Sequence, residues 1–161
     1  MDLPVTELTL RMVVAAGLGA AIGFEREAAS RGAGARTVTL VALGSALFTL
    51  AGAYGFSDSP TAGATDPGRI AAQVATGVGF IGAGAILRDG TSVLGLTTAA
   101  SVWLAAAVGV LVAAGGYVTA TIGTGIASCR AALAITETCE GVAAALGIDP
   151  HQAASPEAER V

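Results

Sequence analysis

Residues 69–88, RIAAQVATGVGFIGAGAILR, decide the fold of this chain because they allow two opposite interpretations. Gly77, Gly79 and Gly82 have the G-x-G-x-x-G spacing of a turn that binds a dinucleotide phosphate. That motif needs a strand before the first glycine and an acidic residue about 20 positions after it. Here the apolar stretch runs on through the glycines, and positions 99–101 are neutral. We therefore interpret the stretch as an apolar helix whose small residues allow close packing in a bilayer.

The composition of the whole chain supports a membrane protein. Hydrophobic residues make up 53% of the 161 residues and charged residues only 12%, about half the charged share of an average soluble domain. Glycine occurs 23 times, and glycine is more frequent in membrane helices than in soluble ones. The chain has no basic patch of the kind that binds nucleic acid. We expect the lipid bilayer, and no nucleic acid, among its partners.

Apolar segments of nearly membrane-spanning length occur five times, judged against the roughly 20 residues that cross a bilayer. They predict an all-α membrane protein, a bundle of about five transmembrane helices within residues 1–135. Residues 136–161 are expected to form a short cytoplasmic tail that is largely disordered. The predicted spans cover residues 8–24, 37–56, 69–87, 97–114 and 117–135.

The arginines predict the orientation of these spans, since cytoplasmic loops carry an excess of basic residues. If the spans alternate in direction, only Arg11 and Arg69 fall on one side. The N-terminus is therefore expected outside and the C-terminus in the cytoplasm. The other side, assigned to the cytoplasm, carries Arg26, Arg31, Arg36, Arg88, Arg130 and Arg160.

Small residues recur every four positions in four of the predicted spans, so they share one face of each helix. Such ladders allow helix backbones to approach closely in lipid, within one chain, in a homo-oligomer or against a partner. They do not by themselves identify which helices touch. The glycines expected to serve helix packing are Gly19, Gly23, Gly79, Gly82 and Gly109.

Polar residues at the start of the third span form the first candidate functional cluster. Asp66 is a suitable N-cap and Pro67 suits the first helical position. Arg69 and Gln73 are four residues apart and share a face. They indicate either a simple helix start with a snorkelling arginine or a polar cluster facing the bundle or a partner. Both interpretations stay open at this point.

A second candidate cluster lies at the inner end of the first span, where Glu25, Arg26 and Glu27 follow one another. The run is typical of a membrane edge, and it could also form a cytoplasmic network with Arg36 and Arg88. Thr97 and Thr98 are expected to cap the fourth span. Trp103 lies two turns inside that span and is interpreted as a packing residue.

The residue types favour a protein that is not an enzyme and has no catalytic, cofactor-binding or metal-binding residues. His151 is the single histidine and lies in the tail, so no nucleophile has a paired base. Asp, Glu and His do not occur near the middle of any predicted span, whereas ion pathways usually carry such residues. Transport nevertheless stays open, since backbone carbonyls at a helix break could coordinate an ion.

Four ordered blocks resemble the membrane domain of the MgtC/SapB family. The resemblance covers most of residues 10–127, and four blocks in order are far more specific than any single motif. The blocks are GFERE (23–27), GARTVTLVALGSALF (34–48), DPGRIAAQVATGVGFIGAGAILR (66–88) and GLTTAASVWLAAAVGVLVAAG (95–115).

This resemblance implies a multi-pass protein of the bacterial inner membrane that is linked to magnesium limitation and, in pathogens, to virulence. It implies action by helix–helix binding to a membrane partner such as the F-type ATP synthase. A small transporter or channel for Mg²⁺ or another small solute is the alternative. Many family members carry a soluble C-terminal domain where this sequence has only a short tail.

Overall fold

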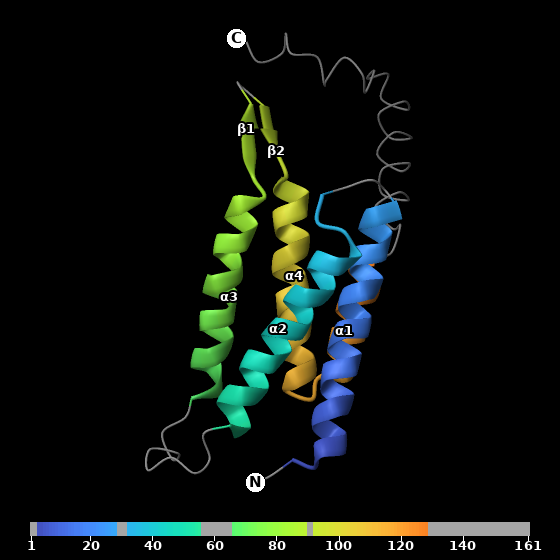
Figure 1. Ribbon diagram of the computed structural model, residues 1–161, viewed down its shortest axis with the longest axis vertical. Coiled ribbons are helices and arrows are strands. Elements are labelled where there is room, and N and C mark those ends of the chain that lie inside the picture. The colour runs from blue at the N-terminus through green and yellow to red at the C-terminus, as the bar shows by residue number, and fades with distance from the viewer. Residues whose placement is uncertain (1–2, 29–31, 56–65, 90–91, 129–161) are drawn as a thin grey trace, which may run out of the picture. The chain divides into compact units, whose positions relative to one another are not determined.

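A computed structural model describes residues 3–28, 32–55, 66–89 and 92–128. Five helices and one two-stranded hairpin make up the described part of the chain (Figure 1). In chain order they are α1 (Val5–Ala28), α2 (Ala35–Tyr54), α3 (Pro67–Gly84), β1 (Leu87–Asp89), β2 (Ser92–Leu94), α4 (Leu96–Ala113) and α5 (Tyr117–Ser128). The architecture is all-α, as the apolar segments predict. The C-terminal end of the fifth predicted span and the tail lie outside the described residues.

Three helices, α1, α2 and α4, are long and apolar enough to cross a membrane by length and composition. This agrees with an all-α membrane protein. Spans at α3 and α5 stay predictions: α3 has the same 18 residues as α4 but is not among these three helices, and the described part of α5 has 12 residues.

Two small-residue cores hold the helices together. The larger core joins α1, α2 and α4, with one residue from α5, and the smaller joins α3 to α4. Alanine and valine dominate both cores, so the helix axes approach closely. The buried hydrophobic residues of the larger core are Ala15, Ile22, Val38, Ala42, Ala46, Leu50, Ala105, Val108, Val112, Ala113 and Ala120, and those of the smaller core are Val74, Val78, Val102 and Ala106.

Helix α3 begins as the sequence predicts. Asp66 is its N-cap, and the Asp66 carboxylate accepts the N–H of Gly68 at 2.9 Å. Pro67 is the first helical residue, where its missing N–H costs nothing. The cap and the proline predicted for the start of this segment are therefore confirmed.

The other end of α3 differs from the predicted span, which extended to Leu87. The helix stops at Gly84, and Leu87 belongs to a hairpin in which it pairs with Leu94. The hairpin leads directly into α4 through Gly95, which has a φ of 87°. Glycine reaches this left-handed conformation without steric cost, and a Cβ on Gly95 would overlap the carbonyl oxygen of Ala85. This close approach joins α3, the hairpin and α4 into one unit.

Candidate functional site

Arg26 is the centre of the most heavily bonded polar site in the described residues. Its side chain lies at the C-terminal end of α1 and is only 3% exposed. The guanidinium donates to the hydroxyls of Ser101 at 2.6 Å and Thr98 at 2.8 Å, both on α4. It also donates to the carbonyl oxygens of Gly32 at 2.7 Å and Ala33 at 3.2 Å. One buried cation thus ties the end of α1, the connection to α2 and the first turns of α4.

Residues 32–34, the described part of the connection between α1 and α2, are held in place by this site. Ala33 has a φ of 54°, a left-handed conformation that costs an L-residue about 1–2 kcal/mol. Arg26 binds the carbonyl of this residue, and Glu27 accepts the N–H of Ala35 at 3.0 Å. Glu27 therefore satisfies one of the unpaired N–H groups at the start of α2. Two consecutive residues of α1 thus bind the strained backbone that leads into α2.

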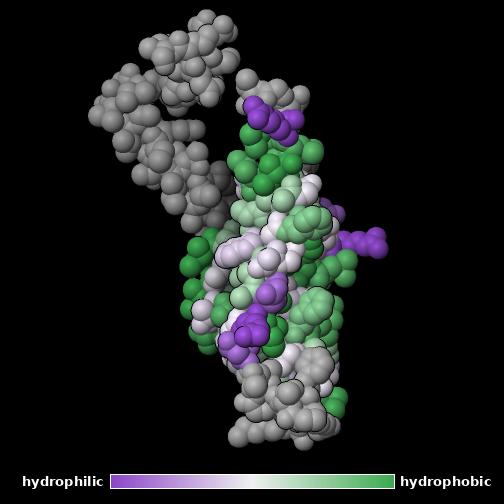
Figure 2. All heavy atoms as spheres, turned by 90° about the vertical axis from the view of Figure 1, so that its left-hand side faces the viewer, coloured by the Kyte–Doolittle hydropathy of each residue, from purple (hydrophilic) through white to green (hydrophobic). Residues whose placement is uncertain are grey.

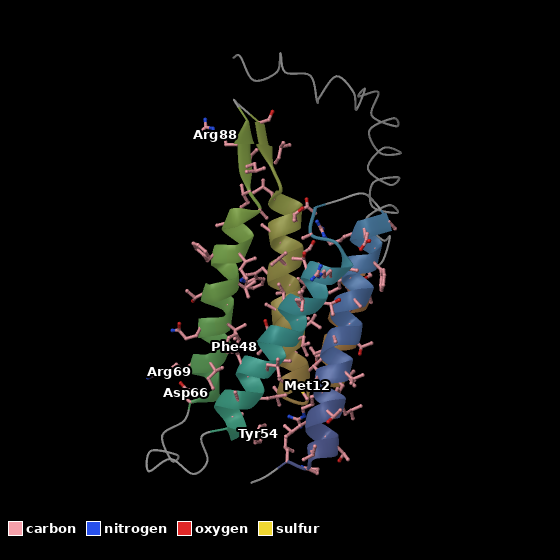
Figure 3. All side chains as sticks on the ribbon, viewed as in Figure 1. Met12, Phe48, Tyr54, Asp66, Arg69 and Arg88 are labelled. Carbon is pink, nitrogen blue, oxygen red and sulfur yellow. The ribbon has the colours of Figure 1, made fainter. Side chains whose placement is uncertain are left out.

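The structure separates the members of the charge run that the sequence groups together. Glu25 and Arg36 are exposed, whereas the side chain of Arg26 extends from α1 and is buried against α4. The bonds from Arg26 described above go to α4 and to residues 32–33. Arg88 is exposed on β1 (Figure 3).

The predicted capping role of Thr97 and Thr98 is wrong. The N-cap of α4 is Gly95, and no side-chain cap bond forms there. Thr98 is used differently, since its hydroxyl accepts a hydrogen bond from Arg26. The β-hairpin supplies the reason, because it places the glycine, and not a threonine, at the turn into the helix.

A second polar site, which the sequence analysis missed, joins α1, α4 and α5 at the opposite end. Arg11 is 9% exposed, and its guanidinium binds Glu7 at 2.9 Å and the carbonyl of Ala113 at 2.5 Å. The hydroxyl of Tyr117 donates to the same Glu7 carboxylate at 2.7 Å. A cation at the last turn of α4 complements the helix dipole. The four-residue spacing of Glu7 and Arg11 was the available signal.

Asp66, Arg69 and Gln73 lie exposed at the start of α3, and Asp66 and Arg69 are labelled in Figure 3. They stand at the end of α3 far from the hairpin, whereas Glu25, Arg26 and Arg36 belong to the end of the helices nearest the hairpin (Figure 1). The six candidate polar residues therefore form two separate groups. The exposure of Arg69 and Gln73 fits a helix start more closely than a cluster that faces the bundle.

The glycines expected at helix contacts occupy three kinds of environment. A Cβ on Gly109 would overlap the carbonyl oxygen of Ala42, and a Cβ on Gly19 would lie 2.7 Å from the Cβ of Ala42. Gly23 is equally close to α2, 2.5 Å from the Cα of Ala35, whereas Gly82 has ordinary contact with Ala99 at 3.6 Å. Gly79 has nothing within 4 Å. Gly79 thus lies on an open face of α3.

An open depression of about 280 Å³ lies on this face, between α3 and α4. Trp103 lines this depression and is 53% exposed. Its interpretation as a packing residue is therefore wrong, since no described helix buries the side chain. Figure 2 shows the α3 side, where hydrophobic residues cover much of the surface and hydrophilic residues gather near its ends. The depression is lined by Val78, Gly79, Gly82, Ala83, Ile86, Ala99, Ala100 and Trp103.

Across residues 3–28, 32–55, 66–89 and 92–128, no three His, Cys, Asp or Glu side chains form a group that could hold a metal ion. The charged side chains that are buried there are Arg11 and Arg26.

Comparison with known proteins places this arrangement in a family. The putative magnesium transporter YhiD of Escherichia coli K12 is 50% identical over 113 residues, which are 69% of this chain and 53% of that protein. Protein MgtC of Salmonella typhimurium LT2 is 46% identical over 120 residues, 74% of this chain and 49% of that protein. The uncharacterized protein slr0014 of Synechocystis is 44% identical over 118 residues, 73% of this chain and 48% of that protein.

The chain spans about half the length of the curated relatives it matches. No solved structure is significantly similar to it. Residues 12–140 match the MgtC family, a range that contains all of α2 to α5 and both polar sites except Glu7 and Arg11. The chain belongs to the MgtC family.

Proposed function

We propose that this chain is a magnesium-related inner-membrane protein that acts by binding a membrane protein partner, the F-type ATP synthase, through its α3–α4 face. The observation that carries the proposal is the open depression between α3 and α4, which is lined by the exposed residues Gly79 and Trp103 among others. Small residues on an exposed helix face let a second helix approach closely in lipid. A partner helix lying there would pack closely against the exposed backbone, whereas lipid chains would fill the depression poorly.

The small-residue ladders of α1 and α4 already serve packing within the bundle. Gly109 of α4 and Gly19 of α1 both lie close to Ala42 of α2, so these two glycines are packed inside the bundle. Gly79 retains an open face on a helix that packs on α4 and α2. Ile86 and Trp103, which line the same depression, are 37% and 53% exposed. The α3–α4 face therefore combines small residues with large apolar ones, which suits a partner helix.

The direct test is ATP synthesis by inverted inner-membrane vesicles, with and without this chain, at a matched proton gradient. If the chain restrains the synthase, vesicles that contain it make ATP more slowly while the gradient is unchanged. Unchanged synthesis at equal gradient and verified insertion would remove the synthase as the partner.

Replacing Gly79 with leucine is expected to abolish partner binding while the bundle stays folded. The leucine side chain would fill the depression, and we expect recovery of the partner in co-purification to fall at least about tenfold, equivalent to about 1.4 kcal/mol. Gly17→Leu is the matched control, since Gly17 is exposed on α1 and also has nothing within 4 Å. Equal recovery with Gly79→Leu and Gly17→Leu would contradict binding at this face.

A second candidate function is transport of Mg²⁺, favoured by the 50% identity to a protein named as a putative magnesium transporter. The electrostatics of the described residues favour it less. Both buried charges are arginines, and a cation passing either site would meet a like charge. Uptake of Mg²⁺ by liposomes containing the purified chain, against empty liposomes, decides between the two functions.

A further inference from the structure

The β1–β2 hairpin carries an apolar surface at its base that no described helix covers. Leu87 and Leu94 are directly paired and lie on one face of the hairpin. They are 66% and 57% exposed, and Leu96, the first residue of α4, is 58% exposed. We call Leu87, Leu94 and Leu96 the hairpin base. Moving this clustered apolar surface out of water into lipid is favourable, since the gain grows with the apolar area removed from water.

Polarity changes along the hairpin from its base to its tip. The pair that follows Leu87 and Leu94 toward the tip is Asp89 and Ser92, and these residues are polar. Arg88 pairs with Val93 on the opposite face. A strand of three residues spans about 10 Å. The hairpin thus passes from apolar to polar over a distance close to the 5–8 Å of headgroup region on each side of a bilayer.

The lengths of the adjoining helices place the membrane boundary in the same region. Helices α3 and α4 have 18 residues each, which corresponds to about 27 Å. The hydrocarbon core is about 30 Å thick, so each helix is slightly short of it even without tilt. Both helices meet the hairpin base at the same end (Figure 1). The base leucines are positioned to supply the missing apolar length.

The hairpin backbone limits how deep it can lie. Its two strands pair with each other, and no other strand of residues 3–28, 32–55, 66–89 and 92–128 pairs with their outer edges. Open sheet edges do not occur in lipid-exposed hydrocarbon, because their N–H and C=O groups need water or headgroup partners. The hairpin therefore fits the headgroup layer, with its leucines reaching the acyl boundary.

We propose that the hairpin is an interfacial anchor that binds the phospholipid surface of the membrane in which α3 and α4 lie. The occupant of the hairpin base is lipid, and the membrane boundary runs between the Leu87–Leu94 pair and the Asp89–Ser92 pair. This anchor fixes the depth of α3, and with it the depth of the α3–α4 face. The proposal is independent of the function proposed above, since it concerns lipid and not a protein partner.

Depth-dependent quenching of tryptophan fluorescence tests the anchor in the full chain. The sequence has one tryptophan, so Trp103→Phe gives a background without this fluorophore. Leu94→Trp and Leu87→Trp then report the hairpin base, Ser92→Trp the tip, and Phe48→Trp a deeper position. Phe48 is 70% exposed on α2, six residues before the end of that helix, about 9 Å inside it. Each variant is reconstituted into phosphatidylcholine–phosphatidylglycerol vesicles that carry brominated lipids.

We expect Leu94→Trp and Leu87→Trp to be quenched at least about twofold more by bromines near the headgroup than by bromines near the chain ends. Phe48→Trp should show the reverse order, and Ser92→Trp should be quenched mainly by aqueous acrylamide. If both base variants respond to acrylamide as strongly as Ser92→Trp, the hairpin lies in water and the proposal fails. If both are protected from acrylamide and from bromolipid, protein covers the base, whether a second copy or another part of the chain, and the proposal also fails.

Discussion

Replacement of Arg26 with alanine is expected to lower the thermal unfolding midpoint of the purified protein in detergent by about 10 °C, for a loss of about 2–4 kcal/mol. The guanidinium binds α4 through Ser101 and Thr98 and the α1–α2 connection through Gly32 and Ala33. Bonds to a charged donor contribute about 1.5–3 kcal/mol each and are not additive. Alanine would leave these acceptors without their shared donor, and the strained turn at Ala33 would lose its main support.

Two further variants separate the geometry of this site from its charge. Arg26→Lys keeps the charge but not the planar fork of donors. We therefore expect its thermal unfolding midpoint to lie between those of the unchanged protein and Arg26→Ala. Arg36→Ala removes an exposed arginine from the neighbouring helix, and exposed charges contribute little. A midpoint for Arg26→Ala within about 2 °C of that for Arg36→Ala would show that the buried arginine does not hold the helices together.

The sequence predicted the helices well because their signals are local. Apolar runs of sufficient length identify all five, and Asp66 followed by Pro67 identifies the start of α3. The hairpin was missed at Leu87, since an apolar residue at the end of an apolar run continues the helical pattern. Only the pairing of Leu87 with Leu94 shows that the backbone there is extended.

The polar sites depended on tertiary structure that no local pattern contains. Glu25, Arg26 and Glu27 are consecutive, so each points in a different direction around the helix, about 100° from the next. Which of the three is buried depends on where α4 lies, and α4 begins 70 residues after Arg26. The site at Arg11 likewise forms only because α4 ends, and α5 begins, beside the start of α1. The residue types were visible in the sequence, but their partners were not.

The small-residue ladders show the same limit most clearly. Gly79 and Gly109 both belong to ladders of small residues spaced four apart, and no local signal distinguishes them. The ladders are Ala75, Gly79 and Ala83, and Ser101, Ala105, Gly109 and Ala113. In the fold, Gly109 faces the carbonyl group of Ala42 across the α2–α4 contact, whereas Gly79 faces open space. One glycine serves the internal core, and the other leaves a surface available to a partner. The same substitution at the two positions must therefore have opposite effects.

Replacement of Gly109 with alanine is expected to destabilise the bundle by about 3 kcal/mol, at the upper end for overpacked cores. A Cβ there would overlap the carbonyl oxygen of Ala42 and lie 3.0 Å from its carbonyl carbon and 3.1 Å from the Cβ of Ser45. These are mainly backbone atoms, so relief requires α2 and α4 to move apart. Gly19 meets the same Ala42 from α1, so such a movement disturbs three helices at once.

Gly79→Ala is the matched control for this prediction, since the same substitution is not expected to lower the thermal unfolding midpoint at this position. Alanine is favoured over glycine in a helix by about 0.8–1 kcal/mol, and at Gly79 nothing within 4 Å opposes the added methyl group. Thermal unfolding in detergent should therefore show a lower midpoint for Gly109→Ala and an equal or higher midpoint for Gly79→Ala. Equal decreases in both variants would mean that α3 is covered as closely as α4, and the α3–α4 face would then not be open to a partner. A lower midpoint for Gly109→Ala alone would show that the ladder of α4 is packed inside the bundle, whereas Gly79 on α3 is not.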